Sequence, residues 1–308
     1  MKSIADLEQE IRNFINGPRK QNVLLQDTAA WTMLCSCLDT IGDTELAIAA
    51  YFSSDPSPAC DETYLLVYGV LQVLFVQQDA VENLWEALSM PSYTRDPALE
   101  RIRDIRNNSV GHPTKRRRGK GYAYNFIARA TLTKTDFRLM TVYRDEVSPR
   151  FEQINIPSLI EEQRKIICSV LQGISEKLRQ EETEHRAQYR NDKLGEVFPP
   201  VGYYFQKIYQ AIAGSHPPGV GGDHVGLVAD IINAFRDKVK ERGLEAEHEC
   251  EIKSLDNAMS RLRDYFDESK NSPFNAQDAE AFVSFIETRI DELKGIASEI
   301  DETYESEP

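Results

Sequence analysis

Three arginines in the chain are each followed by a histidine after five intervening residues: Arg106 and His112, Arg179 and His185, and Arg242 and His248. Such a pair could act on a phosphodiester, because a guanidinium binds phosphate oxygens through parallel hydrogen bonds and an imidazole exchanges protons near neutral pH. The second and third pairs enclose QEETE and GLEAE, whose carboxylates would repel such a substrate. The first pair encloses NNSVG, which carries no charge, so we take Arg106 and His112 as the candidate site.

The residues between this arginine and histidine predict the end of a helix. Six positions along a continuous helix would place His112 about 240° around the axis from Arg106. Gly111, however, favours a helix stop, and Pro113 disfavours the helical conformation for the residue before it. We therefore expect His112 on a loop just past a helix C-terminus, where it can turn back towards Arg106.

The same region is the most basic part of an acidic chain. The whole sequence has 36 Lys and Arg against 50 Asp and Glu, a net charge of −14. Residues 95–144 instead hold 13 basic and 4 acidic side chains. This local excess points to a polyanion, which the rest of the chain would repel. Its densest part follows His112 and consists of Lys115, Arg116, Arg117, Arg118 and Lys120.

Both features also have a purely structural interpretation, which the sequence leaves open. Arg106 could pair with Asp104, Glu100 or a partner helix, while His112 only caps its own helix. The basic run could be a solvated loop without a ligand.

Apolar periodicity and capping residues indicate which elements position the pair. They predict helices over about 27–53, with a break near Gly42, over 61–88 and over 97–110. The second of these is apolar on most sides, which predicts a place at a core centre or a dimer interface. The following residues change to a strand-like pattern, and a β-hairpin is predicted at about 122–143.

A second helical part is predicted after the hairpin and a long connecting helix. Ser158 and Glu161 form a capping-box pattern that would begin the connecting helix, which reaches about residue 180. Four further helices are predicted at about 200–213, 224–242, 246–267 and 275–301. The expected fold is mainly α: a helical domain with an inserted hairpin over 1–190, then an acidic helical domain over 191–308. The acidity of the second domain suggests that it binds a basic protein partner or covers the basic segment of the first domain.

Other patterns that could do chemistry are weaker. Cys35 and Cys37 lie about 200° apart around a helix and cannot readily hold one metal ion, and His248 and Cys250 share this spacing. We therefore expect no metal site. The glycine-rich segment GSHPPGVGGDHVG precedes a helix, where a phosphate could bind. It lacks a P-loop lysine and a preceding strand, which favours an ordinary loop between helices.

The segment RNNSVGH, from Arg106 to His112, resembles the signature of HEPN domains (higher eukaryotes and prokaryotes nucleotide-binding). In that signature an arginine, usually followed by a polar residue, precedes a histidine by four to six intervening positions. The predicted helices over about residues 20–180 are similar in order to the antiparallel helical bundle of this family, with the hairpin as an insertion. The C-terminal half resembles no family.

This resemblance implies a metal-independent endoribonuclease that works as a homodimer, with two motifs facing each other. His112 would act as general acid or base, Arg106 would hold the phosphoryl oxygens and Asn107 would orient one of them. The basic residues at 115–120 would gather the RNA backbone. No cofactor is implied, and a toxin-like or defence-related role would fit such an enzyme.

Two other functions stay open: a non-catalytic HEPN-like module that binds RNA or a nucleotide, and a helical protein-interaction scaffold. Five cysteines without framework spacing, and an N-terminus without an apolar signal stretch, predict a cytoplasmic protein. The longest nearly apolar run, residues 64–76, contains Gln72 and is too short to span a bilayer, so no membrane partner is expected.

Overall fold

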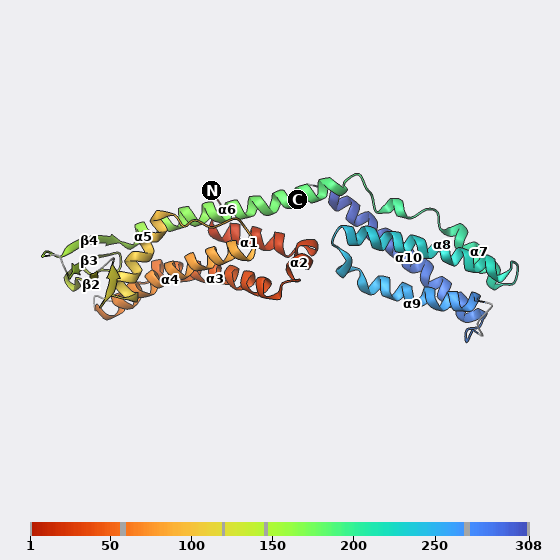
Figure 1. Cartoon of the computed structure of the whole chain (residues 1–308), viewed down its shortest axis with the longest axis horizontal. Coiled ribbons are helices and arrows are strands. Elements are labelled where there is room, and N and C mark those ends of the chain that lie inside the picture. Colours follow the sequence, from red (N-terminus) through yellow and green to blue (C-terminus); the bar gives the residue numbers. More distant parts are fainter. Residues whose placement is uncertain (1, 56–59, 119–120, 145–146, 268–271, 307–308) are drawn as a thin grey trace. The chain divides into compact units, whose positions relative to one another are not determined.

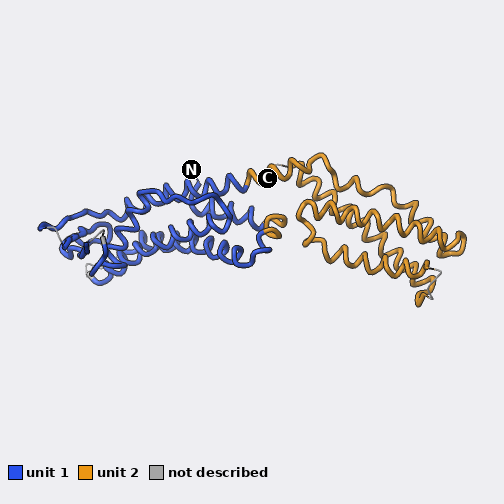
Figure 2. Tube along the Cα trace, in the orientation of Figure 1, with its two compact units in different colours: residues 1–16, 24–178 blue, residues 17–23, 179–308 orange. Residues whose placement is uncertain are grey.

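The structure is a computed structural model that describes residues 2–55, 60–118, 121–144, 147–267 and 272–306. Helices dominate the described part and four strands form one small antiparallel sheet, which confirms the predicted mainly α class (Figure 1). The chain divides into two compact units (Figure 2). Unit 1 comprises residues 1–16 and 24–178, and unit 2 comprises residues 17–23 and 179–308. The division falls inside a helix at residue 178, rather than at 190.

Unit 1 is built from helices that each bury an apolar face: α1 (Ile4–Ile15), α3 (Thr28–Ser53), α4 (Cys60–Ala87), α5 (Pro97–Arg106) and most of α6 (Ile156–Tyr189). Asp27 caps α3 as predicted, since its carboxylate accepts hydrogen bonds from the backbone N–H groups of Ala29 and Ala30. The break expected near Gly42 is wrong, because α3 continues through it. A glycine costs a helix only about 1 kcal/mol, less than the packing of α3 against α4 contributes.

The start of α6 differs from the sequence prediction. The helix begins at Ile156, and Asn155 caps it: its side-chain oxygen accepts from the Ser158 backbone N–H at 2.9 Å and from the Ser158 hydroxyl at 2.6 Å. Glu161 pairs with Lys165 at 2.8 Å. The predicted capping box of Ser158 and Glu161 is therefore wrong, because an amide three residues earlier takes the capping position.

The sheet contains more than the predicted hairpin. Its strands pair antiparallel in the order β1 (Arg116–Arg118), β2 (Gly121–Ile127), β3 (Asp136–Tyr143) and β4 (Arg150–Asn155). The β2–β3 pair confirms the hairpin, while β1 and β4 extend it on both sides. Phe137, Leu139 and Ile154 are buried in one core cluster with helix residues, so one face of the sheet packs on the helices.

Three buried glutamines join α4 to α6. The Gln78 amide donates to Gln163 Oε1 at 2.7 Å, and the Gln163 amide donates to Gln77 Oε1 at 2.9 Å and to the Leu74 carbonyl at 3.0 Å. Gln77 in turn donates to Glu45 on α3 at 2.8 Å. Buried amides need such partners, so this glutamine layer fixes how α3, α4 and α6 are aligned along their lengths.

By length and composition alone, one helix within the described residues, Asp61–Ala87, could cross a membrane. The core helix of a soluble protein passes the same test, and 44% of the relevant window is buried inside the protein.

Unit 2 contains the four helices predicted after residue 199: α7 (Gly202–Ile212), α8 (Pro218–Glu241), α9 (Glu249–Phe266) and α10 (Ala276–Glu305), together with most of α2 (Pro18–Leu24). The predicted loop between the first two of these helices is present but shorter than expected. It includes Gly214, whereas α8 already begins at Pro218 and includes the later glycines of the segment. A Cβ at Gly221 would lie 2.4 Å from the Phe266 ring. This glycine therefore allows α8 to pack closely on α9.

Candidate functional site

A wide helical turn follows α5 at the predicted helix end. This π-turn, η1 (Asn107–Gly111), closes with a hydrogen bond from the His112 N–H to the Asn107 carbonyl at 2.7 Å. His112 has left the helix, with φ −139° and ψ 51°, so the predicted stop at Gly111 is confirmed. Single π-turns inside or at the end of α-helices occur frequently at functional sites.

Neutral groups hold the guanidinium of Arg106 in place. Its Nε and Nη2 donate to Oε1 of Gln72 on α4 at 2.9 and 2.5 Å, and its Nη1 donates to Oδ1 of Asn107 at 2.8 Å. The ring of Phe75 lies beneath it, 4.3 Å from the guanidinium carbon. These bonds use three of the five N–H groups, and no carboxylate among the described residues forms an ion pair with Arg106. Within the described residues, Arg106 is thus held by neutral hydrogen-bond acceptors alone.

The π-turn also places Arg106 against the residue that precedes the histidine. A Cβ added to Gly111 would lie 2.7 Å from Arg106 Nη1 and 3.2 Å from Asn107 Oδ1. A side chain larger than hydrogen would thus displace the guanidinium. His112 comes directly after this contact and is exposed to solvent. The structure brings together Arg106, Asn107 and the backbone that leads to His112.

The carboxylates that could have paired with Arg106 pair with other arginines. Glu100 binds Arg95 at 2.7 Å, and Asp104 binds Arg116 at 2.7 Å. The alternative in which Arg106 pairs with Asp104 or Glu100 is therefore wrong. A partner helix does hold Arg106, but through the neutral amide of Gln72.

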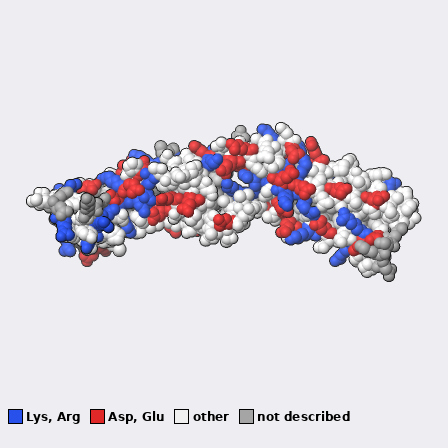
Figure 3. All heavy atoms as spheres, in the orientation of Figure 1, with Lys and Arg blue, Asp and Glu red and all other residues white. Residues whose placement is uncertain are grey.

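The predicted basic residues fall into different surroundings. Arg116 is largely buried and also donates to Asn108 Oδ1 at 2.7 Å, so it ties β1 to α5 and η1. Lys115 is exposed and lies 4.4 Å from the centre of the Tyr122 ring, and Arg117 is exposed on β1. Arg118 ends β1, and Lys120 lies outside the described residues. Lys and Arg side chains gather over this end of unit 1 on the face seen in Figure 3.

Two polar atoms are buried close to the π-turn and have no hydrogen-bond partner within the described chain: Ser109 Oγ and Asn125 Nδ2. Ser109 belongs to the turn itself. The Asn125 backbone N–H donates to the Pro113 carbonyl at 2.7 Å, which fastens the segment after His112 to β2. Such unsatisfied groups are rare in proteins, and a catalytic role is one of the explanations known for them.

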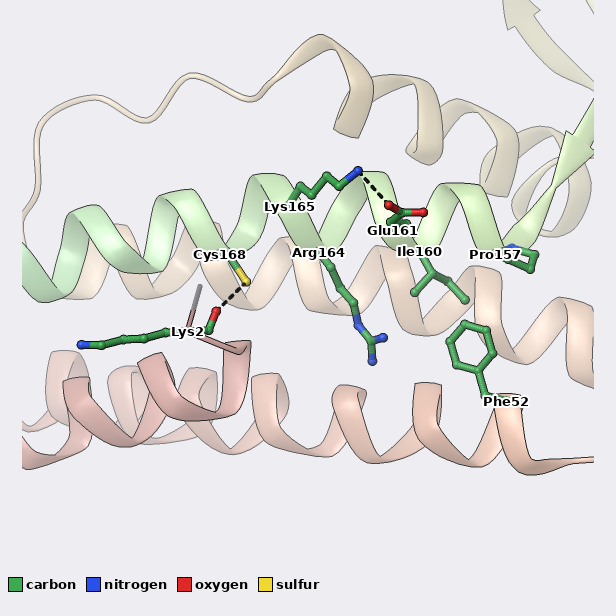
Figure 4. A pocket seen from close by; sticks show the side chains of 8 residues that line it. All are labelled: Lys2, Phe52, Pro157, Ile160, Glu161, Arg164, Lys165 and Cys168. Carbon is green, nitrogen blue, oxygen red and sulfur yellow. Dashed lines mark hydrogen bonds and ion pairs between the residues drawn. The ribbon is translucent and has the colours of Figure 1, made fainter.

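A hollow of about 510 Å³ beside α6 offers no reactive group (Figure 4). The guanidinium of Arg164 binds Glu45 at 2.7 Å, and Lys165 pairs with Glu161. Burial raises the pKa of the Cys168 thiol, which keeps it protonated and a poor nucleophile.

A second hollow, of about 620 Å³, lies between α5 and strands β3 and β4. Arg101 at its edge pairs with Glu152 at 3.0 Å, and the Arg150 guanidinium lies 4.8 Å from the Tyr143 ring centre. Neither of these two hollows is lined by Arg106 or His112.

The other two arginine–histidine pairs have structural surroundings in unit 2. His185 shares a hydrogen bond of 2.9 Å with the Tyr304 hydroxyl, and burial lowers the pKa of His185 to about 4, with Arg19 acting in the same direction. Arg242 is 1% exposed and binds the Asp192 carboxylate at 3.2 Å. These side chains stabilise the packing of unit 2 rather than face a substrate.

Sequence reasoning missed two residues of the candidate site, Gln72 and Phe75. Both lie on α4, more than 30 residues before Arg106 in the chain, so only the tertiary structure shows that they hold the guanidinium. The one available signal was the polar Gln72 within an otherwise apolar run.

Comparisons with known proteins give no assignment. No family model matches the chain, and no curated protein or solved structure matches it significantly. Within the described residues, no group of three His, Cys, Asp or Glu side chains could hold a metal ion. The HEPN resemblance stays a prediction from the sequence.

Proposed function

We propose that the chain is a metal-independent endoribonuclease of the HEPN type, with Arg106, Asn107 and His112 at its reaction centre. One observation carries the proposal: neutral partners hold the charged Arg106 against Gly111, directly before the exposed His112. A guanidinium without a carboxylate partner is suited to bind a phosphate.

The proposed reaction transfers the phosphorus from one oxygen of the RNA to another. The 2′-oxygen forms a bond to the adjacent phosphorus as its proton passes to a base, and the bond from phosphorus to the 5′-oxygen breaks as that oxygen gains a proton. The products are a 2′,3′-cyclic phosphate and a 5′-hydroxyl. His112 transfers a proton, and the remaining N–H groups of Arg106 stabilise the negative charge on the phosphorane.

Gln72 and Phe75 act as positioning residues in this proposal. The amide oxygen of Gln72 accepts two hydrogen bonds from Arg106 without adding charge, and the Phe75 ring lies below the guanidinium plane. We expect Gln72→Glu to lower cleavage at least tenfold, because a carboxylate at this place would neutralise Arg106. Gln72→Glu should leave the thermal unfolding temperature close to that of the wild type. Equal cleavage by both proteins would show that the charge of Arg106 is not used.

The decisive test is cleavage of a labelled single-stranded RNA by the full chain. We expect His112→Ala and Arg106→Ala each to lower the rate at least 100-fold, with unchanged cleavage in EDTA. A single 2′-deoxy substitution in the RNA should block cleavage at that position. His248→Ala removes the histidine of the third pair and serves as the matched control, for which we expect the wild-type rate.

The outcomes separate the three candidate functions. RNA binding without cleavage by the wild type would contradict the enzyme and leave a non-catalytic binding module. A chain that neither binds nor cleaves RNA would leave only the interaction scaffold.

One surface of α4 supports a homodimer that pairs two sites. Leu65 and Tyr68 are 75% and 39% exposed. Their spacing of three and four residues places them on the same helix face as Gln72 and Phe75. A partner copy that covers the exposed residues would therefore lie next to Arg106.

Leu65→Glu tests this arrangement. We expect the variant to be monomeric by light scattering and to lose cleavage while it stays folded. Leu227→Glu, which changes a leucine that is 43% exposed in unit 2, is the matched control. A wild-type chain that is monomeric yet active would contradict the dimer.

A further inference from the structure

The sheet of unit 1 has an outer face that no part of the proposed reaction uses. Phe137 and Leu139 of β3 are buried against the helices, so the residues between them point the opposite way. On β2, the same alternation places Tyr122, Tyr124 and Phe126 on the outer face, two positions apart. Their neighbour Ala123 is buried on the inner face. Figure 1 shows this sheet at the end of unit 1.

Exposed rings on this face form a row across three strands. Phe126 of β2 is paired with Met140 of β3, and Met140 is paired with Phe151 of β4. Phe126 is 51% exposed and Phe151 is 56% exposed. Because neighbouring strands lie about 4.8 Å apart, the two phenylalanines are separated by about 10 Å. The two rings thus flank Met140 in an apolar row across the three strands.

Cations lie close to the aromatic rings of this face. The Arg138 guanidinium is 5.9 Å from the Phe151 ring centre, and the Lys115 ammonium is 4.4 Å from that of Tyr122. Arg117 of β1 is paired with Tyr122 and is exposed. On the described strands, the outer face has a single carboxylate, that of Asp136, at the end of β3.

The carboxylate of Asp136 does not oppose these cations. It accepts a hydrogen bond from the Asn155 amide at 2.8 Å, at the edge of the face. Glu152 belongs to the inner face, where it is paired with Leu139 and binds Arg101. The outer face is therefore both aromatic and positively charged.

We propose that this outer face binds single-stranded RNA, with bases stacked on the rings and phosphates bound by Lys115, Arg117 and Arg138. Stacking on aromatic side chains and contacts between cations and the backbone together describe how proteins bind single strands. A duplex would bury its bases away from the rings, and an acidic protein would pair with the cations without using the exposed rings. The choice of RNA rests on the proposed function.

Strand β2 of this sheet is connected to the candidate reaction centre. Asn125 lies between Tyr124 and Phe126 on β2, and its backbone N–H binds the Pro113 carbonyl at 2.7 Å. Pro113 directly follows His112. The segment that follows the histidine is therefore hydrogen-bonded directly to a strand of this sheet.

Binding can be measured separately from cleavage in a chain that carries His112→Ala. We would titrate it against a fluorescein-labelled 12-nucleotide RNA, single-stranded or paired with its complement, and follow fluorescence anisotropy. We expect at least tenfold tighter binding of the single strand. Phe126→Ala and Phe151→Ala should each weaken it about tenfold. Phe126→Trp and Phe151→Trp keep a ring and should retain affinity, which separates stacking from a folding defect.

The chain offers a matched control in unit 2, where Phe285 is 37% exposed and lies 5.3 Å from the Arg289 guanidinium. Phe285→Ala should leave RNA affinity unchanged. Replacing Arg117 or Arg138 by Gln should lower the slope of log K against log salt by about 0.7 each. Equal affinity for duplex and single strand, or unchanged affinity after loss of both rings, would overturn the proposal.

Failure of this inference is distinguishable from failure of the enzyme. If wild type cleaves RNA and the ring variants retain the wild-type KM, the outer face is not the binding surface, although the reaction centre stands. If the ring variants lose binding while wild type does not cleave, the binding face stands without the nuclease.

Discussion

Replacing Gly111 by alanine tests whether the position of Arg106 matters for the proposed reaction. The added carbon would lie 2.7 Å from Arg106 Nη1, and ordinary contact begins at 3.4 Å, so the guanidinium must retreat by about 0.7 Å. A displacement near 1 Å at a reacting group can cost about 100-fold in rate. We therefore expect Gly111→Ala to lower RNA cleavage by about 10- to 100-fold.

The fold should tolerate the same substitution. Gly111 is not among the described glycines with positive φ, and the atom in the way is the end of a flexible side chain. Alanine also restricts the unfolded chain more than glycine does. We expect the free energy of unfolding to change by less than about 1 kcal/mol.

Single-turnover cleavage of a labelled RNA and thermal unfolding would be measured on the same preparations. Gly173→Ala on α6 is the matched control, because its added carbon meets no atom within 4 Å. We expect Gly173→Ala to cleave at the wild-type rate. If Gly111→Ala also cleaves at that rate while Arg106→Ala does not, the exact position of the guanidinium does not affect cleavage and the reasoning is wrong. Loss of stability with activity would instead assign Gly111 a structural role.

Two further predictions concern unit 2. Gly221→Ala would place a carbon 2.4 Å from the Phe266 ring, so we expect the free energy of unfolding, measured with urea, to fall by about 1–3 kcal/mol. Gly226→Ala, whose added carbon has no neighbour within 4 Å, is the control and should leave this free energy unchanged. Equal results for both variants would contradict close packing at Gly221. The pKa of His185, about 4 in the folded chain, lies below its ordinary value of 6.5. The unfolded chain therefore binds more protons between these values, and stability falls as pH drops from 6.5 towards 4. Because His185 is partly exposed, we expect the free energy of unfolding to fall by about 1 kcal/mol between pH 7 and pH 5. His185→Gln should lack this fall, and the same pH dependence in both proteins would refute the reasoning.

Local signals in the sequence were enough to predict most helices and the hairpin. Asp27 and Pro97 stand where α3 and α5 begin, and the aromatic and β-branched residues of β2 and β3 match a strand pattern. The cap of α6 was predicted wrongly because Asn155 and Ser158 can both cap a helix, and only the three-dimensional structure selects between them. Such competition between nearby polar residues is not visible in a periodic pattern.

The remaining features depend on contacts between distant residues. β1 consists of three arginines, which have no strand pattern of their own, and it forms because Arg116 reaches Asp104 and because β2 supplies backbone partners. The π-turn likewise has no sequence signal. Gly111 and Pro113 predicted where the helix stops, but not that the turn widens and brings the backbone against Arg106.

The glutamine layer has a consequence for how this protein can be altered. Gln77 follows Gln72 by five residues, about 7.5 Å along the axis of α4. Because both lie on one rigid helix, the hydrogen bonds that fix the position of Gln77 along the bundle also fix that of Gln72. If α4 slid by one residue, the amide of Gln163 would lose its acceptors in an apolar interior, at a cost of about 1–3 kcal/mol for each group. Replacing the glutamines of this layer by leucine would remove that constraint on α4. The helical bundle could then melt at a higher temperature, while Gln72, the hydrogen-bond acceptor of Arg106, lies at a different position along the bundle. Thermostability would then be a misleading guide to an intact candidate site.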